Sequence, residues 1–334
     1  MKLVRVTVSL FLVFSVVFTL FFGLGEIKKE YKIEETPEYK GILSVWQIDS
    51  FEGGTGSRRK FLLSAAKTFE KSHEGVLIMV TNYNEEGVKE NLEKGIYPDM
   101  ISFGIGTEVK GFGKIKVESK NYNFSGGNID GKTYAVPWCR GSYALVKNPK
   151  LAENFTPNLS EVIVSKGENT QPLAALGLSG YTAEKIEIKE PMEAYVKFVS
   201  GKVPYFLCTQ RDLVRLSNRN FDFDALPLNG YNDLYQYISV TTKSSDKYYN
   251  CEEFINYLIG EKCQNELKNI SMFSPYFDLS YDGAYGELSK NIPSLTLSAF
   301  SDRGAAEKLA LLSESLVLGD KSSEIKIKNM LIVP

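Results

Sequence analysis

Apolar positions along this chain follow two alternating spacings, one typical of buried strands and the other typical of amphipathic helices. Short apolar runs at 42–48, 76–80 and 100–103 predict strands, because β-branched and aromatic residues fill them and polar turns flank them. Between these runs, residues 58–71 and 85–94 repeat apolar side chains every three or four positions, which predicts helices. Alternating strands and helices with short connections predict an α/β fold with parallel strands.

The pattern changes at 138–141, where four residues join two extended pieces at 134–137 and 143–146. We expect this join to be the first crossing between two lobes, and a strand at 237–241 to mark the second. The remaining residues predict further elements in chain order: a loop-rich stretch at 150–190, a helix at 192–199, a strand at 205–208, a short helix from Thr209, an apolar return at 225–228, a helix at 251–268, a final helix at 305–316 and a terminal segment at 324–333.

Two lobes joined by two crossings predict a clamp that closes on a ligand through a hinge. Each lobe is expected to hold a mostly parallel sheet flanked by helices. The expected boundaries are a signal or anchor segment at 1–25, a linker at 26–40, the first lobe at 41–138 and 237–290, the second lobe at 139–236, and a C-terminal helical segment at 291–334 whose lobe the pattern leaves open.

The first residues predict export of everything that follows them. Lys2 and Arg5 precede an uncharged apolar run at 6–24, about the 19 residues of a long signal peptide or a membrane-spanning anchor. The positive-inside rule places Lys2 and Arg5 in the cytoplasm and the chain after Gly25 outside. We therefore expect the protein at the outer face of the cytoplasmic membrane, either held by the apolar run or secreted after its cleavage.

Composition describes an ordinary globular protein of 334 residues with room for two domains. A net charge of −2 gives no basic surplus for nucleic acid. The single histidine, His73, and the absence of any C-x-x-C argue against a zinc site, and no cofactor is expected. Cys139 and Cys208 fall in expected cleft segments, where they either pair or remain buried free thiols.

A loop with three glycines at 52–58 follows the first expected strand and precedes its helix, with Ser57 as the N-cap. It lacks the G-x-x-x-x-G-K-[ST] order of a nucleotide-binding P-loop. Ligands of open α/β sheets bind at the carboxyl ends of strands, which makes Trp46, Asp49 and Glu52 binding candidates. The alternative is a tight turn that needs glycine for its backbone angles.

Two further candidates come from the second lobe. Gln210 and Arg211 begin a short helix that is expected to face the cleft, although Arg211 has Asp212 beside it as an alternative structural partner. Tyr231 opens an aromatic, amide-rich stretch before the second crossing. Such side chains stack on sugar faces and bind hydroxyls, and they also cover cores.

Several segments match one family in their order and spacing. These are the strand with Val45 and Trp46, the loop 51–54, the helix end 66–70, the segments 98–101 and 134–138, and the helix 254–267 with Gln264. Over most of residues 41–334 the chain resembles extracellular solute-binding protein family 1, the binding component of carbohydrate-type ABC importers. One departure is the absence of the lipidated cysteine that tethers such proteins in single-membrane bacteria.

That resemblance implies a two-lobed periplasmic-binding type II fold. It also implies capture of a sugar, an oligosaccharide or a similar polar solute by a monomer, followed by delivery to ABC permease subunits without catalysis. The positions that match the family imply cleft roles for Trp46, Asp49, Phe103, Gly104, Trp138, Arg140, Gln210 and Arg211.

Two other functions stay open from the sequence. The same clamp would serve a membrane-tethered sensor or partner-binding module that signals instead of feeding a permease. A secreted glycan hydrolase is less favoured: it needs two carboxyl groups flanking the glycosidic bond. The side chains able to form such a pair are Asp49, Glu52, Asp99 and Asp212.

Overall fold

The computed structural model describes residues 11, 12, 14–16, 18, 39–107 and 111–334. The chain divides into two units, Met1–Glu38 and Tyr39–Pro334. Most of the expected signal or anchor segment at 1–25, and of the linker at 26–40, lies outside the described residues. Among the residues that the structure does describe, no helix has the length and apolar character needed to cross a membrane.

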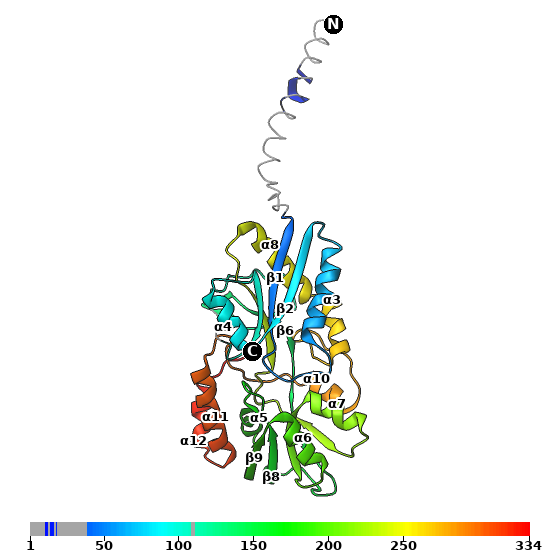
Figure 1. Ribbon diagram of the computed structural model, residues 1–334, viewed down its shortest axis with the longest axis vertical. Coiled ribbons are helices and arrows are strands. Elements are labelled where there is room, and N and C mark those ends of the chain that lie inside the picture. Colours follow the sequence, from blue (N-terminus) through cyan, green and yellow to red (C-terminus); the bar gives the residue numbers. More distant parts are fainter. Residues whose placement is uncertain (1–10, 13, 17, 19–38, 108–110) are drawn as a thin grey trace. The chain divides into compact units, whose positions relative to one another are not determined.

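Five strands of the second unit form a first sheet with the order β2-β1-β3-β12-β6. Its strands are β1 (Gly41–Ile48), β2 (Val76–Tyr83), β3 (Met100–Gly104), β6 (Val136–Arg140) and β12 (Tyr235–Val240). The helices of this part, which we call the first lobe, are α3 (Arg58–Glu70), α4 (Glu85–Glu93), α8 (Ser245–Leu258), α9 (Glu261–Asn265) and the 3-10 turn η2 (Glu266–Ile270) (Figure 1). A two-stranded hairpin pairs β4 (Asn128–Ile129) with β5 (Lys132–Thr133).

The other five strands form a second sheet with the order β11-β7-β10-β8-β9. Its strands are β7 (Tyr143–Lys147), β8 (Asn158–Ser165), β9 (Thr182–Lys189), β10 (Tyr205–Thr209) and β11 (Asp224–Pro227). The helices of this second lobe are α5 (Pro172–Leu178), α6 (Pro191–Val199), α7 (Gln210–Asn218), α10 (Gly283–Lys290), α11 (Arg303–Val317) and α12 (Ser322–Lys328).

Helix α3 shows how the apolar spacing builds the first lobe. Its buried face carries Phe61, Leu62, Ala65, Ala66 and Phe69. Ser57 caps its N-terminus as expected, because the Ser57 hydroxyl accepts a hydrogen bond of 3.3 Å from the amide of Lys60. Burial of each large side chain on this face stabilises the fold by roughly 1.5–3 kcal/mol. The helix therefore fixes the loop that connects it to β1.

The chain passes between the lobes at three places. It leaves the first lobe between β6 and β7 and returns between β11 and β12, near the two expected crossings. A third passage follows η2, because α10 contacts α7 and β11 of the second lobe. The expected boundaries placed α10 with the first lobe. Helix α11 contacts α5 and β9, and α12 contacts α11, so both C-terminal helices belong to the second lobe (Figure 1).

In each sheet four of the five strands run in the same direction, as expected of a mostly parallel sheet, and one strand runs against them: β12 is antiparallel to β3 and β6, and β7 is antiparallel to β10 and β11. Two local expectations differ from the structure. The stretch 150–190 is not loop-rich: β8, α5 and β9 lie within it, and the alternating charges of β9 fit a half-exposed strand. The expected helix at 251–268 is interrupted at Gly260, which is the N-cap of α9.

Candidate functional site

Two adjoining cavities lie where the carboxyl ends of parallel strands from both sheets meet. Their volumes are about 580 and 560 Å³, and they share Glu85, Glu86 and Asn169 in their walls. The first lobe contributes residues that follow β1, β2 and β3, and the second lobe contributes residues that follow β8 and β9. Such strand ends are the usual ligand sites of α/β folds. We call the two cavities together the cleft.

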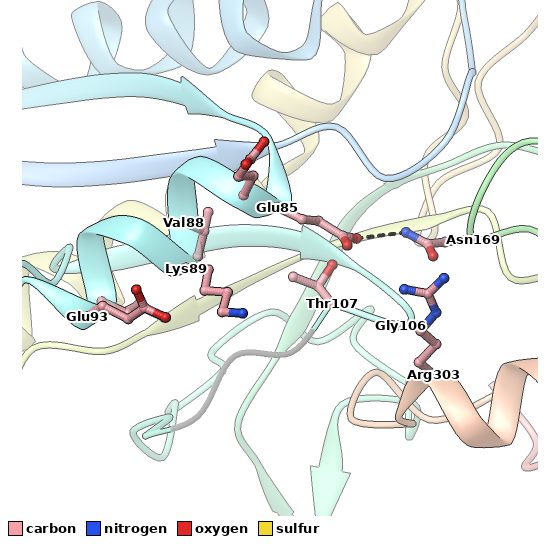
Figure 2. Close-up of a pocket in the computed structure, with 10 residues that line it drawn as sticks. Glu85, Val88, Lys89, Glu93, Gly106, Thr107, Asn169 and Arg303 are labelled. Atoms are coloured by element: carbon pink, nitrogen blue, oxygen red, sulfur yellow. Dashed lines mark hydrogen bonds between the residues drawn. The ribbon is translucent and has the colours of Figure 1, made fainter.

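One hydrogen bond joins the two lobes inside the cleft. The Asn169 side-chain amide donates to the Glu85 carboxylate at 2.8 Å, as Figure 2 shows. Glu85 lies in the first turn of α4, whose N-cap Asn84 accepts a hydrogen bond of 2.9 Å from Gly87. Helix N-termini favour negative charge, so Glu85 and Glu86 are stabilising in the first turn of α4.

An ion pair provides a second connection between the lobes. An Nη1–Oε2 distance of 2.9 Å joins Arg211, at the start of α7, to Glu52 in the glycine loop. Arg215 lies 4.0 Å from the same carboxylate and 3.0 Å from Asp212. The structure therefore pairs Arg211 across the cleft with Glu52, while Asp212 pairs with Arg215.

Asp49 and Glu52 are the two expected site residues that line the cleft. Asp49 accepts hydrogen bonds from Arg58 Nε at 2.8 Å and from Gln47 Nε2 at 3.1 Å. The buried Arg58 guanidinium also donates to the Phe51 carbonyl and lies 4.3 Å from the centre of the Phe51 ring. Arg58 thus holds the glycine loop in place and neutralises Asp49.

The expected aromatic site residues lie in the core. Trp138 is fully buried, stacks on Phe61 at 5.3 Å between ring centres and donates a 2.9 Å hydrogen bond to Ser102. Trp46 contacts Tyr83 at 5.0 Å, and Phe103 stacks on Phe112 at 5.3 Å. None of these expected residues lines either cavity. The cleft as described therefore has no exposed aromatic platform formed by them.

Tyr231 belongs to a buried network at the second crossing. Its hydroxyl and that of Tyr143 donate to Asp233 at 3.2 and 2.6 Å, and the amide of Gln171 donates at 2.7 Å. Burial raises the pKa of Asp233 to about 6, although the three hydrogen-bond donors act to lower it. The network joins the crossing to the N-terminus of α5.

Arg140, Gln210 and Gly104 have structural contacts at or near the crossings. The buried Arg140 guanidinium donates to the carbonyls of Ser274 and Ser289, which tie the third passage to the first. Gln210 accepts a hydrogen bond of 3.0 Å from the Ser142 amide. A side chain on Gly104 would clash, because its Cβ would lie 1.8 Å from the Ser50 hydroxyl.

All four cysteines are free and buried. The alternative of a Cys139–Cys208 pair is therefore not formed. Burial raises the pKa of both thiols, which keeps them protonated and unreactive near neutral pH.

Sequence reasoning missed several residues of the cleft. Thr107, Glu168, Asn169 and Glu190 line it, and so does the α4 start at 85–86. A signal existed for α4, since Asn84 and two acidic residues directly follow an expected strand. The sequence shows no such signal for Glu168, Asn169 and Glu190, because the polar pattern of 150–190 predicts a loop-rich stretch and so hides that these residues follow strands.

No family model and no curated protein sequence matches the chain. Solved structures do. The sugar-binding protein MalE from Xanthomonas citri matches with a TM-score of 0.59 and 14% identity, over 87% of this chain and 95% of that one. Iron-bound HitA from Pseudomonas aeruginosa matches with a TM-score of 0.54 and 15% identity, over 83% and 99%. The GacH receptor of Streptomyces glaucescens, which was solved with acarbose, matches with a TM-score of 0.53 and 14% identity, over 87% and 97%.

These structures establish the fold that the sequence resemblance implied. The chain has the two-lobed α/β architecture of periplasmic-binding type II proteins.

Proposed function

We propose that the protein is an extracytoplasmic solute-binding protein that captures a polar solute between its lobes and delivers it to an ABC importer. The observation that carries this proposal is the cleft, whose 560 Å³ cavity is lined by both lobes and falls in the size range of small-molecule sites. The bridges Glu85–Asn169 and Glu52–Arg211 are the contacts that closure of such a clamp would make.

The solute class follows from the polar cleft walls. The walls offer carboxylates, a side-chain amide and a hydroxyl. These groups can accept hydrogen bonds from a polar solute, whose donors would otherwise lose their hydrogen bonds to water on burial. A sugar or oligosaccharide is one solute of this kind, and the similar structures include both a sugar-binding protein and an iron-bound one. Recognition here would rest on hydrogen bonds, since the expected aromatic rings lie in the core.

The proposed function also includes a location for the protein at the cytoplasmic membrane. Residues 6–24 would hold the protein at the outer face of the cytoplasmic membrane, or would direct its secretion before cleavage. The protein would act as a monomer and meet permease subunits at that membrane. Co-purification with a membrane kinase in place of permease subunits would instead favour the sensor alternative.

The contacts of the four candidate carboxylates disfavour hydrolysis. Each has a cationic partner: Asp49 with Arg58, Glu52 with Arg211, Asp99 with Lys247, and Asp212 with Arg215. A general acid for glycoside cleavage needs a raised pKa, which a nearby cation opposes. Asp212 does have its pKa raised by burial to about 6, yet it does not line the cleft.

A thermal-shift screen of the full chain in mild detergent tests the proposal. A solute at about 100 times its dissociation constant should stabilise the protein by about 2.7 kcal/mol. The double variant Glu85→Ala, Asn169→Ala should weaken the shift, and Lys94→Ala, at the far end of α4, should leave it unchanged. The proposal fails if neutral, basic and acidic solutes all leave the melting temperature unmoved.

A further inference from the structure

The cleft concentrates negative charge far beyond the average of the chain. Its walls carry a formal charge of −5, although the whole chain carries only −2. The cavity of 560 Å³ has six acidic side chains in its lining and, among the described residues, neither lysine nor arginine. The charged residues of both cavities are Asp49, Glu52, Glu85, Glu86, Glu93, Glu168 and Glu190, with Lys89 and Arg303.

Only some of these carboxylates are neutralised by the protein itself. Asp49 pairs with Arg58, and Glu52 pairs with Arg211. Glu85, Glu86, Glu168 and Glu190 form no ion pair with any lysine or arginine in the described part of the chain. Arg303, whose side chain points toward Asn169 and Gly106 in Figure 2, is paired with Glu307 at 3.2 Å.

The uncompensated charges come from both lobes. Glu85 and Glu86 belong to the first turn of α4, and Glu168 and Glu190 follow β8 and β9. The four side chains are exposed and lie at one cavity, where their like charges repel one another. A positively charged guest removes that repulsion, whereas an acidic guest increases it.

A buried hydroxyl provides an independent sign of a missing ligand. Thr107 is only 8% exposed and lines the 580 Å³ cavity, yet its Oγ1 has no hydrogen-bond partner among the described residues. Figure 2 shows this oxygen on the side of the cavity that faces Glu85 and Asn169. A buried hydroxyl without a partner is unfavourable, and it can accept a hydrogen bond from an ammonium group.

We propose that the cleft selects an organic cation, a solute that carries at least one ammonium group. Glu85, Glu86 and Glu168 would neutralise the ammonium group, and Thr107 would accept one of its hydrogen bonds. Cavities of 580 and 560 Å³ fit an organic molecule and are far larger than a bare ion needs. This inference rests on the proposed solute-binding function and narrows its solute class from polar molecules in general to basic ones.

Calorimetric titration of the full chain in mild detergent tests this inference with five probes. Spermidine and glucosamine are cationic, maltotriose is neutral, digalacturonate is acidic, and Ca²⁺ alone represents a metal ion. We expect a cationic organic probe to bind and its affinity to fall when sodium chloride rises from about 20 to about 200 mM, because salt screens the carboxylates. Glu85→Gln and Glu168→Gln should each weaken binding about tenfold or more.

The matched control is Glu90→Gln, an equivalent change on the exposed face of α4 outside both cavities. It should leave the affinity unchanged, and melting temperatures should show that all three variants fold. Binding of maltotriose or digalacturonate alone, insensitive to the cleft variants, would overturn the inference but keep the solute-binding function. Binding of Ca²⁺ alone would also overturn it. Failure of every probe would contradict both proposals.

Discussion

The carboxylate of Glu52 lies 2.9 Å from the guanidinium of Arg211, which connects the glycine loop after β1 to the first turn of α7. The two residues come from different lobes and lie more than 150 positions apart in the chain. Both side chains are partly exposed, at 48% and 33%, so the pair contributes little to folding stability. We therefore expect the ion pair to affect how the two lobes are positioned relative to each other more than it affects folding stability.

Replacement of Arg211 should therefore separate closure from stability. We expect Arg211→Ala to weaken solute affinity several-fold, while the free energy of unfolding falls by less than about 1 kcal/mol. Titration calorimetry and urea unfolding measure the two quantities. Arg59→Ala is the control, because Arg59 is an exposed arginine that does not line the cleft. Equal affinity in the two variants would show that the pair does not take part in closure.

Trp138 should behave as a core residue. Trp138→Ala removes the stack on Phe61 and the hydrogen bond to Ser102, and should lower the free energy of unfolding by about 3–5 kcal/mol. Urea unfolding of the full chain measures this loss. Trp138→Phe should recover part of it, because a ring remains beside Phe61. A stable Trp138→Ala variant that has lost solute binding would instead assign the ring to the ligand.

Arg140 should be needed for the contact between the first and third passages. Arg140→Lys places a single ammonium group where the guanidinium donates to two carbonyls, those of Ser274 and Ser289. We expect a loss of about 1–3 kcal/mol, since one buried acceptor stays unsatisfied. Proteolysis under native conditions should then cut faster within residues 271–282, the passage between η2 and α10. Unchanged stability and cleavage would show that Arg140 does not hold this passage.

Asp233 gives the protein a defined response to pH. Its pKa of about 6 in the folded state exceeds the value of about 3.9 in an unfolded chain, so the folded state binds this proton more tightly. Asp233 therefore disfavours folding at pH 7 and adds stability as pH falls from about 6 to about 4, by at most about 1.4 kcal/mol per pH unit. Asp212, whose pKa is also raised to about 6 by burial, acts in the same direction.

Unfolding of Asp233→Asn across this pH window measures the effect. The variant should lack the part of the acid-side gain that comes from Asp233, and the exposed Asp246→Asn variant should keep the wild-type slope. Parallel slopes for the wild type and Asp233→Asn would place the Asp233 pKa near its ordinary value.

The sequence predicted the first lobe well where periodicity was strong. The spacing of Phe61, Leu62 and Phe69 placed α3 correctly, and Ser57 caps it as expected. Asp49 and Glu52 could be located because they follow a strand, and the topology carries any residue at that position to the cleft.

Residues inside strands could not be assigned in the same way. All five residues of β3 and of β6 are buried, so Phe103 and Trp138 show no alternation that would tell which face points toward a ligand. The edge strand β9 failed for the opposite reason, since its charged positions resemble a loop. The third passage depends on packing of α10 against α7 and β11, which short-range patterns do not encode.

The central claim is that a solute binds between the lobes and closes them, and the distance between the lobes tests it most directly. Nitroxide labels on the variants Ile96→Cys in the first lobe and Met192→Cys in the second would attach at exposed positions, while the four native cysteines stay buried. Double electron–electron resonance should show one shorter, narrower distance distribution when a solute that stabilises the protein is added at saturation. A distribution that the same bound solute leaves unchanged would contradict the account.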